Sequence, residues 1–242
     1  MGDARYHAFM VFRITLIRAL LAADVAHWML QQDTFWRDDL FRMGLEENCT
    51  LGGMDAIFDR GGHDEEGARN RWLNGASMFL RPTERGKSIF KRIEATMTRY
   101  WVPEIGMIIY YCDTGELDCM FIPYRIASGW QWFYSAAASK GSRSPALLQM
   151  DGENDTGGKT AVMRKYGLYF LDEDTTLCNQ TAVETTIEMY NNGRHPRAER
   201  TWSKVEHDFY CRFAEILLRI PLIGSVVRRY LMMVCFYLMP TF

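Results

Sequence analysis

The sequence lacks an excess of charge of either sign. It has 28 Lys and Arg against 30 Asp and Glu, a formal net charge of −2 in 242 residues. Proteins that bind nucleic acids normally carry a clear basic excess, so we expect no nucleic-acid partner. The hydrophobic fraction of 48% and the charged fraction of 24% are those of a folded globular chain and exclude a disordered or collagen-like one.

The cysteines show none of the spacings of a structural zinc site. No two of them form a CxxC pair, and none stands with a histidine at zinc-finger spacing. Cys112 and Cys119 flank a predicted turn and would face each other in one hairpin register. A disulfide there would need an oxidising compartment. Because no secretory signal is evident, we expect free thiols in a reducing cytosol. The six cysteines are Cys49, Cys112, Cys119, Cys178, Cys211 and Cys235.

Long uninterrupted apolar runs are also absent from the amino-terminal region. Residues 9–29 are strongly apolar, but Arg13, Arg18 and Asp24 interrupt them. This pattern fits neither a signal peptide nor a bilayer-spanning helix. It predicts a broad apolar helix with a thin polar stripe.

Linear motifs of catalysis and of metal binding are missing. The segment 152–160 resembles a phosphate-binding loop, but Glu153 stands where the first glycine belongs. The same segment begins like a calcium loop, yet Thr156 and Val162 replace the required Gly and Glu. No HExxH or GxSxG pattern occurs. We therefore predict no catalytic residue, no metal site and no cofactor. Three matches to the N-glycosylation pattern, at Asn48, Asn154 and Asn179, are interpreted as chance matches in a cytosolic chain.

The order of predicted elements is helices, then strands, then helices. Two apolar runs, Met107–Tyr111 and Leu117–Ile122, are separated by Asp-Thr-Gly, which predicts a β-hairpin. Further strands are expected at 130–134, 146–150 and 166–171. Helices are expected at 9–29, 33–44, 65–73, 84–100, 181–190, 201–220 and 222–239.

This order predicts the α+β class, with an antiparallel sheet built around a central β-hairpin and flanked by amino- and carboxyl-terminal apolar or amphipathic helices. We expect one domain over 1–242. Residues 1–100 would be mainly helical, 105–171 β-rich and 181–242 helical, ending in an apolar segment at 213–242.

The carboxyl-terminal segment suggests attachment. Residues 213–242 are nearly all apolar, and Arg228 and Arg229 stand near the middle of the one window long enough to span a bilayer, which disfavours insertion. Two arrangements stay open: the segment packs on the amino-terminal helix, or it lies in a membrane interface with its arginines at lipid phosphates. The predicted contact residues are Arg219, Arg228, Arg229, Tyr230, Phe236, Trp130 and Trp132. For the two tryptophans, a buried strand is the alternative.

From these observations we predict a non-enzymatic binding or regulatory module. Its partner would be an anionic membrane surface or a protein, and its location the cytoplasmic side of a membrane or, alternatively, the soluble cytoplasm. A second hypothesis is an intracellular enzyme whose site is assembled from the acidic loops 151–155 and 172–174 with His195 or His207. A third is a homo-oligomer that buries the carboxyl-terminal apolar face.

Overall fold

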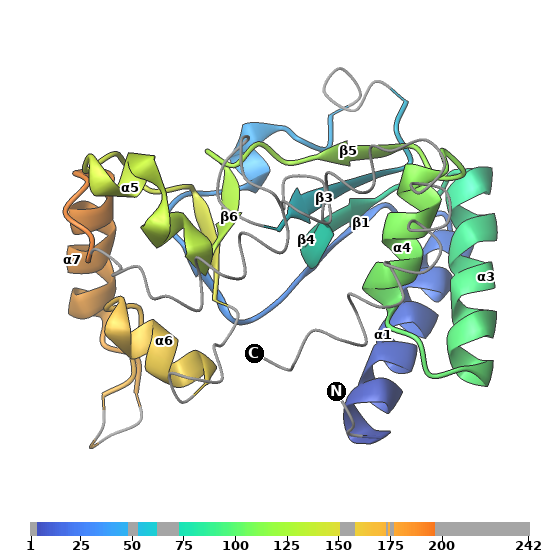
Figure 1. Ribbon diagram of the computed structural model, residues 1–242, viewed down its shortest axis with the longest axis horizontal. Coiled ribbons are helices and arrows are strands. Elements are labelled where there is room, and N and C mark those ends of the chain that lie inside the picture. The colour runs from blue at the N-terminus through green and yellow to red at the C-terminus, as the bar shows by residue number, and fades with distance from the viewer. Residues whose placement is uncertain are drawn as a thin grey trace, which may run out of the picture.

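The computed structural model describes residues 4–47, 53–61, 73–150, 158–172, 174 and 177–196. These residues form an α+β fold, as the sequence predicts, with two small sheets between two groups of helices (Figure 1). The first sheet holds β1 (His27–Leu30), β4 (Leu73–Leu80), β3 (Ala56–Arg60) and β5 (Cys119–Phe121), in that order. The second holds β2 (Thr34–Trp36), β7 (Leu147–Gln149) and β6 (Ala127–Gly129).

Both sheets are mixed rather than purely antiparallel. In the first, β4 pairs antiparallel with β1 and β3, and β5 lies parallel to β3. In the second, β7 pairs antiparallel with β2 and parallel with β6. The connection between β1 and β2 is three residues long, and Gln31 N–H still donates to Ala76 O beside the first sheet, 2.9 Å away. The chain therefore passes directly from one sheet to the other at residues 31–33.

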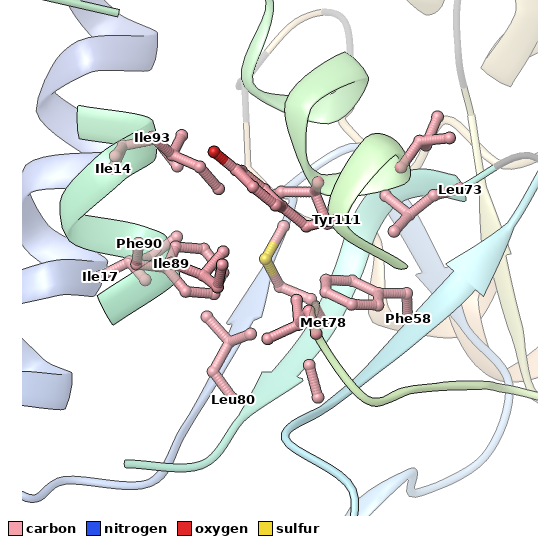
Figure 2. Packing of buried hydrophobic residues seen from close by; sticks show 14 of the residues in the cluster. Ile14, Ile17, Phe58, Leu73, Met78, Leu80, Ile89, Phe90, Ile93 and Tyr111 are labelled. Carbon is pink, nitrogen blue, oxygen red and sulfur yellow. The ribbon is translucent and has the colours of Figure 1, made fainter. Parts of the chain in front are cut away.

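Three helices cover one face of the first sheet: α1 (Ala4–Ala22), α3 (Glu84–Arg99) and α4 (Glu104–Asp113) (Figure 1). Strand alternation explains this, because Phe58 and Met78 point to the helices whereas Ile57 and Phe79 point to the opposite face. Figure 2 shows Ile14 and Ile17 of α1 and Ile89, Phe90 and Ile93 of α3 meeting those strand residues in one apolar cluster.

Capping residues set the start of the two helices whose limits the sequence predicts best, α3 and α7 (Gln180–Asn191). Thr83 caps α3 by accepting a hydrogen bond from Gly86 N–H at 3.0 Å, and Glu84 and Arg99 complement the helix dipole at its two ends. Asn179 caps α7 in the same way, through Ala182 N–H at 2.9 Å. Both helices lie within about two residues of their predicted limits.

The second group of helices packs on aromatic side chains. It comprises the 3₁₀ helix η2 (Trp130–Tyr134) and the helices α5 (Ala136–Ser139), α6 (Lys159–Lys165) and α7 (Figure 1). Phe133 stacks face to face on Tyr166 with ring centroids 3.9 Å apart. The Tyr190 hydroxyl donates to Tyr166 O at 2.6 Å, which satisfies a polar atom inside this cluster.

A buried arginine connects α1, β4 and α4. Arg13 is 6% exposed, and its Nη2 donates to Gly75 O at 2.6 Å while its Nη1 lies 3.4 Å from Glu104 Oε1. Burial raises the pKa of the Glu104 carboxyl, and the Arg13 charge acts in the opposite direction. Because a buried charge is costly unless it is paired and hydrogen-bonded, these contacts fix the position of the three elements.

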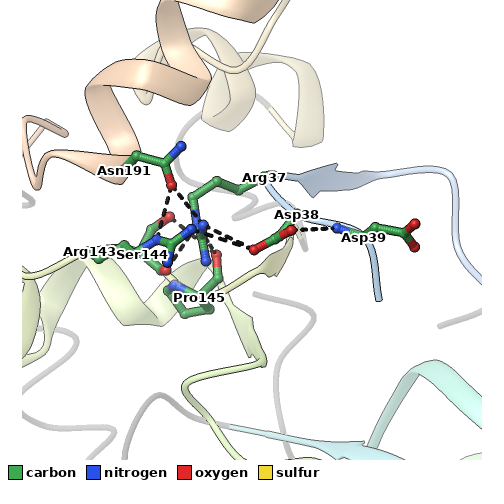
Figure 3. Close-up of polar contacts among 7 residues, drawn as sticks. All are labelled: Arg37, Asp38, Asp39, Arg143, Ser144, Pro145 and Asn191. Atoms are coloured by element: carbon green, nitrogen blue, oxygen red, sulfur yellow. Dashed lines mark hydrogen bonds and ion pairs between the residues drawn. The ribbon is translucent and has the colours of Figure 1, made fainter. Parts of the chain in front are cut away.

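A second buried arginine connects the end of β2 with α7. Arg37 Nε donates to Ser144 O and Pro145 O at 3.1 Å each, and its Nη1 donates to Asn191 Oδ1 at 2.7 Å (Figure 3). Burial and the nearby Arg143 guanidinium both lower the pKa of Arg37. The donors of Arg37 bind backbone and amide oxygens of the protein itself, and its Nη1 also lies 3.7 Å from Asp38 Oδ2. We therefore assign this cluster a structural role.

The predicted central hairpin fits the structure only loosely. Its second strand is present as β5, but its first run lies in helix α4, and β5 pairs with β3. The buried residues Glu104, Ile108, Ile109 and Tyr111 recur at helical spacing, and Pro103 stands directly before the first turn. A short apolar run does not distinguish a strand from a buried helix, which is why the β-rich composition misled.

The expectation of free thiols at Cys112 and Cys119 is wrong. The two residues form a disulfide that joins the last turn of α4 to the first residue of β5. They therefore meet across a helix–strand junction rather than across two strands of a hairpin.

Residues 1–100 contain more strand than predicted. The predicted helix 9–29 ends at Ala22, because Asp24 adopts a φ of +57° and the chain then enters β1. Residues 33–44 form β2 and the 3₁₀ helix η1 (Phe41–Met43) instead of a helix. Strand β3 replaces a predicted loop. Of the predicted strand 166–171, only an isolated bridge between Leu171 and Cys178 is present. The predicted helices 201–220 and 222–239 lie outside the described residues.

Gly75 provides a test of the packing between β4 and α4. Its φ is +72°, and a Cβ there would lie 1.9 Å from Ile105 Cδ1. We expect Gly75→Ala to lower the free energy of unfolding by about 1 kcal/mol through backbone strain and by a further ~1–3 kcal/mol through overpacking, measured by urea denaturation.

Gly115→Ala is the matched control, since Gly115 has the same φ of +72° and a Cβ there meets nothing within 4 Å. It should lose only the strain energy. Equal losses of unfolding free energy in the two variants would contradict the role of the Ile105 contact. The double variant Gly75→Ala/Ile105→Ala should recover part of the loss seen in Gly75→Ala, and no recovery would also contradict that role.

Glu104 should make stability depend on pH. Its folded-state pKa lies above the ordinary value of 4.5, so its contribution to stability is complete below about pH 4.5 and is lost as the pH rises through the folded-state pKa. We expect the stability of Glu104→Gln relative to the natural protein to increase between about pH 4 and about pH 7 in urea titrations. If the difference in unfolding free energy between Glu104→Gln and the natural protein stays constant or decreases over this pH range, burial is not the main influence on the pKa of Glu104.

Candidate functional site

Six polar side chains converge where the two sheets meet, and we call them the Asp59 cluster: Gln31, Asp33, Asp59, Asn74, Gln149 and Lys159. Asn74 Nδ2 donates to Asp59 Oδ2 at 3.2 Å and to Gln149 Oε1 at 3.4 Å. Gln149 Nε2 donates to Gln31 Oε1 and to Asp33 Oδ2, each at 3.2 Å. Lys159 Nζ forms an ion pair with Asp33 Oδ2. One continuous network thus links two carboxylates, three amides and an ammonium group.

The fold brings these side chains together from separate elements. Asp59 stands near the carboxyl end of β3, and Gln149 is the last residue of β7. Asn74 lies in β4, beside the point where the register with β3 shifts between Phe58 and Arg60. The cluster therefore lies at the carboxyl ends of β3 and β7 and at the amino end of β4.

The network is buried at one end and open at the other. Asp59 is 2% exposed and Gln149 is 1% exposed, whereas the Lys159 side chain is 52% exposed. Asp33 lies between them, with 18% of its side chain exposed. A ligand that arrives from solvent would therefore meet the ammonium group first and the buried carboxylate last. The protein fixes the orientation of Asp59 through Asn74.

A second aspartate just before the same strand has a different role. Asp55, which precedes β3, accepts hydrogen bonds from Thr83 Oγ1 at 2.5 Å and from Asp118 N–H at 2.9 Å, and its Oδ2 lies 3.2 Å from Arg85 Nε. It joins the starts of β3, α3 and β5 and is 3% exposed. Both of its oxygens bind groups of the protein, so Asp55 is a structural residue.

The cluster is not a ready-made metal cage. In the described part of the chain, no group of three or more His, Cys, Asp or Glu residues is placed to hold a metal ion. Mg²⁺, however, is usually bound by one or two protein carboxylates together with substrate phosphates and water. Asp59 and Asp33 are the carboxylates of the cluster that fit such a partial site.

The structure places Trp130 and Trp132 in η2, where they are 7% and 4% exposed. Their burial agrees with the alternative that assigned them to the core, although the element is a 3₁₀ helix and not a strand. The other predicted contact residues, Arg219, Arg228, Arg229, Tyr230 and Phe236, lie outside the described residues, and their contact with a membrane or partner stays a prediction. Among the helices between residues 4 and 196 that the structure describes, none combines the length and the apolar character needed to cross a membrane.

The structure gives little support to a catalytic site formed by the acidic loops 151–155 and 172–174 with His195 or His207. Asp172 Oδ1 accepts a hydrogen bond from Asp174 N–H within its own loop. His195 packs edge-on against Trp132, with ring centroids 4.6 Å apart, and is 8% exposed. Among the described residues, the ring of His195 contacts Trp132, Phe133 and Tyr190, and its Nδ1 lies 3.3 Å from Pro196 O rather than beside a carboxylate. Residues 151–155 and His207 lie outside the part of the chain that the structure describes.

Sequence reasoning missed Asp59, Asn74 and Gln149. The Gly- and Asp-rich composition around residue 59 predicted a loop, yet the apolar run Ala-Ile-Phe directly before it is the signal of a short buried strand. Lys159 belongs to the segment 152–160, whose spacing departs from that of a phosphate-binding loop. The structure places it in the cluster through Asp33, without that motif.

Comparison with known proteins yields one family. The model of the nucleotide-diphospho-sugar transferase family matches residues 1–163, about two thirds of the chain. No curated protein matches the chain, and no solved structure does. The matched residues contain every member of the Asp59 cluster.

This match overturns the prediction of a non-enzymatic module attached to a membrane or partner, since the family is one of transferases. The error arose because the cluster comes from five separated segments, and no linear motif links them. The predicted partners and the predicted location are not addressed by the match and stay predictions.

The two aspartates should respond differently to substitution. Asp55→Ala removes the acceptor of two hydrogen bonds and of Arg85, so we expect a loss of about 2–4 kcal/mol in the free energy of unfolding. Asp59→Asn keeps an oxygen for Asn74 and removes a buried charge, so its stability should stay within about 1 kcal/mol of the natural protein. Urea denaturation of both variants measures this. The assignment of roles fails if Asp59→Asn is the less stable of the two.

Proposed function

We propose, because the chain belongs to the nucleotide-diphospho-sugar transferase family, that it is an enzyme that transfers a glycosyl group from a nucleoside diphosphate sugar to an acceptor hydroxyl. The observation that carries the proposal is the position of the Asp59 cluster: all six residues lie within the matched range 1–163 and meet at the carboxyl ends of β3 and β7.

The reaction defines what the cluster must supply. The acceptor oxygen forms a bond to the anomeric carbon, the bond from that carbon to the diphosphate oxygen breaks, and the acceptor loses its proton. Positive charge develops on the sugar in an oxocarbenium-like transition state. A buried carboxylate near the anomeric carbon stabilises this charge or accepts the proton. Asp59 is the buried carboxylate of the cluster, and we assign it this role.

The donor diphosphate needs positive charge and hydrogen-bond donors. Lys159 offers an exposed ammonium group. The amide groups of Asn74 and Gln149 each donate two hydrogen bonds within the cluster, so they would bind the diphosphate only by exchanging those partners. In the free protein Asp33 pairs with Lys159, so the diphosphate would compete with Asp33 for the same ammonium group. If the donor binds as its Mg²⁺ complex, Asp33, beside Lys159, is the carboxylate that would hold the metal, which would neutralise diphosphate charge and leave Asp59 for the sugar.

Asp59→Asn tests the proposal. We expect release of nucleoside diphosphate from a panel of UDP- and GDP-sugars to fall about 10²–10⁴-fold in kcat, because the carboxylate acts in the transition state. Lys159→Met should mainly raise KM for the donor, because the ammonium group binds the ground state. Steady-state kinetics with the full chain and an acceptor mixture measure both effects.

Asp172→Asn is the matched control. It removes an aspartate of the acidic loop 172–174, outside residues 1–163, and should leave kcat and KM unchanged. Turnover that survives in Asp59→Asn but is lost in Asp172→Asn would place the site in the acidic loop. An absence of turnover and of UDP or GDP binding in the natural protein would overturn the transferase proposal itself.

A further inference from the structure

The Cys112–Cys119 disulfide indicates in which kind of cellular compartment the chain folds. Cys112 closes the end of α4 and Cys119 opens β5, and their Cα atoms are 5.6 Å apart, within the usual range for a disulfide. Structural disulfides form and persist in oxidising compartments and are rare in the cytosol of most organisms. The expectation of a cytosolic chain came from the lack of an evident secretory signal, and the free thiols that it implied at these two positions are replaced by a disulfide.

In an oxidising secretory compartment, the N-glycosylation patterns of the sequence could be modified with glycans. Asn179-Gln180-Thr181 is the match that lies within the described residues, and all three residues are exposed. They stand at the surface where α7 begins, outside the Asp59 cluster. The matches at Asn48 and Asn154 lie outside the described residues.

The cap at Asn179 is compatible with a glycan. Its Oδ1 accepts the hydrogen bond from Ala182 N–H at 2.9 Å, whereas a glycan attaches to Nδ2. In the transfer, Nδ2 loses a proton and bonds to the first sugar of a lipid-diphosphate-linked oligosaccharide, and the bond from that sugar to the diphosphate breaks. The modified side chain remains an amide, so its oxygen still caps the helix.

We infer that the chain folds in an oxidising secretory compartment, where the Cys112–Cys119 disulfide forms, and that it carries an N-linked glycan on the exposed helix cap Asn179. This inference goes beyond the proposed transferase activity and does not depend on it. It replaces the expectation of a cytoplasmic location.

Peptide mapping of the full-length protein, purified from its source cells, tests both parts. Treatment with peptide N-glycosidase should convert Asn179 to Asp and increase electrophoretic mobility. Alkylation without reduction should label Cys178, which is free and exposed, but not Cys112 or Cys119. After reduction, all three should be labelled.

Two variants expressed in the same cells separate the glycan from the helix cap. Gln180→Pro blocks the acceptor pattern but keeps Asn179, and proline is favoured at the first position of a helix. We expect complete loss of the glycan on Asn179 with α7 intact. Thr181→Ser keeps the pattern and should keep the glycan.

An unmodified Asn179 in the natural protein would overturn the glycan, and labelling of Cys112 and Cys119 without reduction would overturn the oxidising compartment. Modification that persists in Gln180→Pro would show that it is not N-glycosylation of this pattern. Transferase kinetics measured on the same preparations report on the proposed function separately, since Asn179 lies outside the Asp59 cluster.

Discussion

The pairing of Arg13 with Gly75 and Glu104 is the constraint on which the rest of the described structure depends. A guanidinium group that is 6% exposed has lost most of its hydration, and only close hydrogen-bonding partners compensate for that loss. Arg13 finds them on two other elements, a backbone carbonyl of β4 at 2.6 Å and a carboxylate of α4 at 3.4 Å. A shift of α1 would break both contacts, and a shift of β4 or α4 would break one of them, so each shift would remove part of the compensation for a buried charge.

The same contacts extend to the Asp59 cluster. Gly75 O receives the Arg13 hydrogen bond, and Asn74 is the preceding residue, so the backbone that carries the central amide of the network is held from the opposite side of the sheet. The register between β3 and β4 shifts at this point, between Phe58 and Arg60. Irregularities of this kind re-aim side chains near functional sites. The core of α1 and α4 thus determines where Asn74 and Asp59 meet.

The sequence predicted elements whose limits are set locally and failed where tertiary pairing decides. The caps Thr83 and Asn179 define the starts of α3 and α7 without help from the rest of the chain, and β7 was located by a short apolar run. The run at 105–111 has strand composition, but it is a helix because its buried side chains fit the cluster beneath α1 and α3. Strand β2 depends on its pairing with β7, more than a hundred residues away, which composition does not reveal.

The site was less predictable than the fold for a related reason. Of the six residues in the Asp59 cluster, Gln31 and Asp33 are the only pair close in sequence, and neither carries a motif. Their chemistry arises from the three-residue passage between the sheets, which places a carboxylate of that passage against Gln149 and Lys159. Polar residues that occur singly in a sequence become a network only when the sheet edges meet. A site of this kind is therefore found from the hydrogen bonds that buried amides and carboxylates share. The match to residues 1–163 then relates that network to the family of nucleotide-diphospho-sugar transferases.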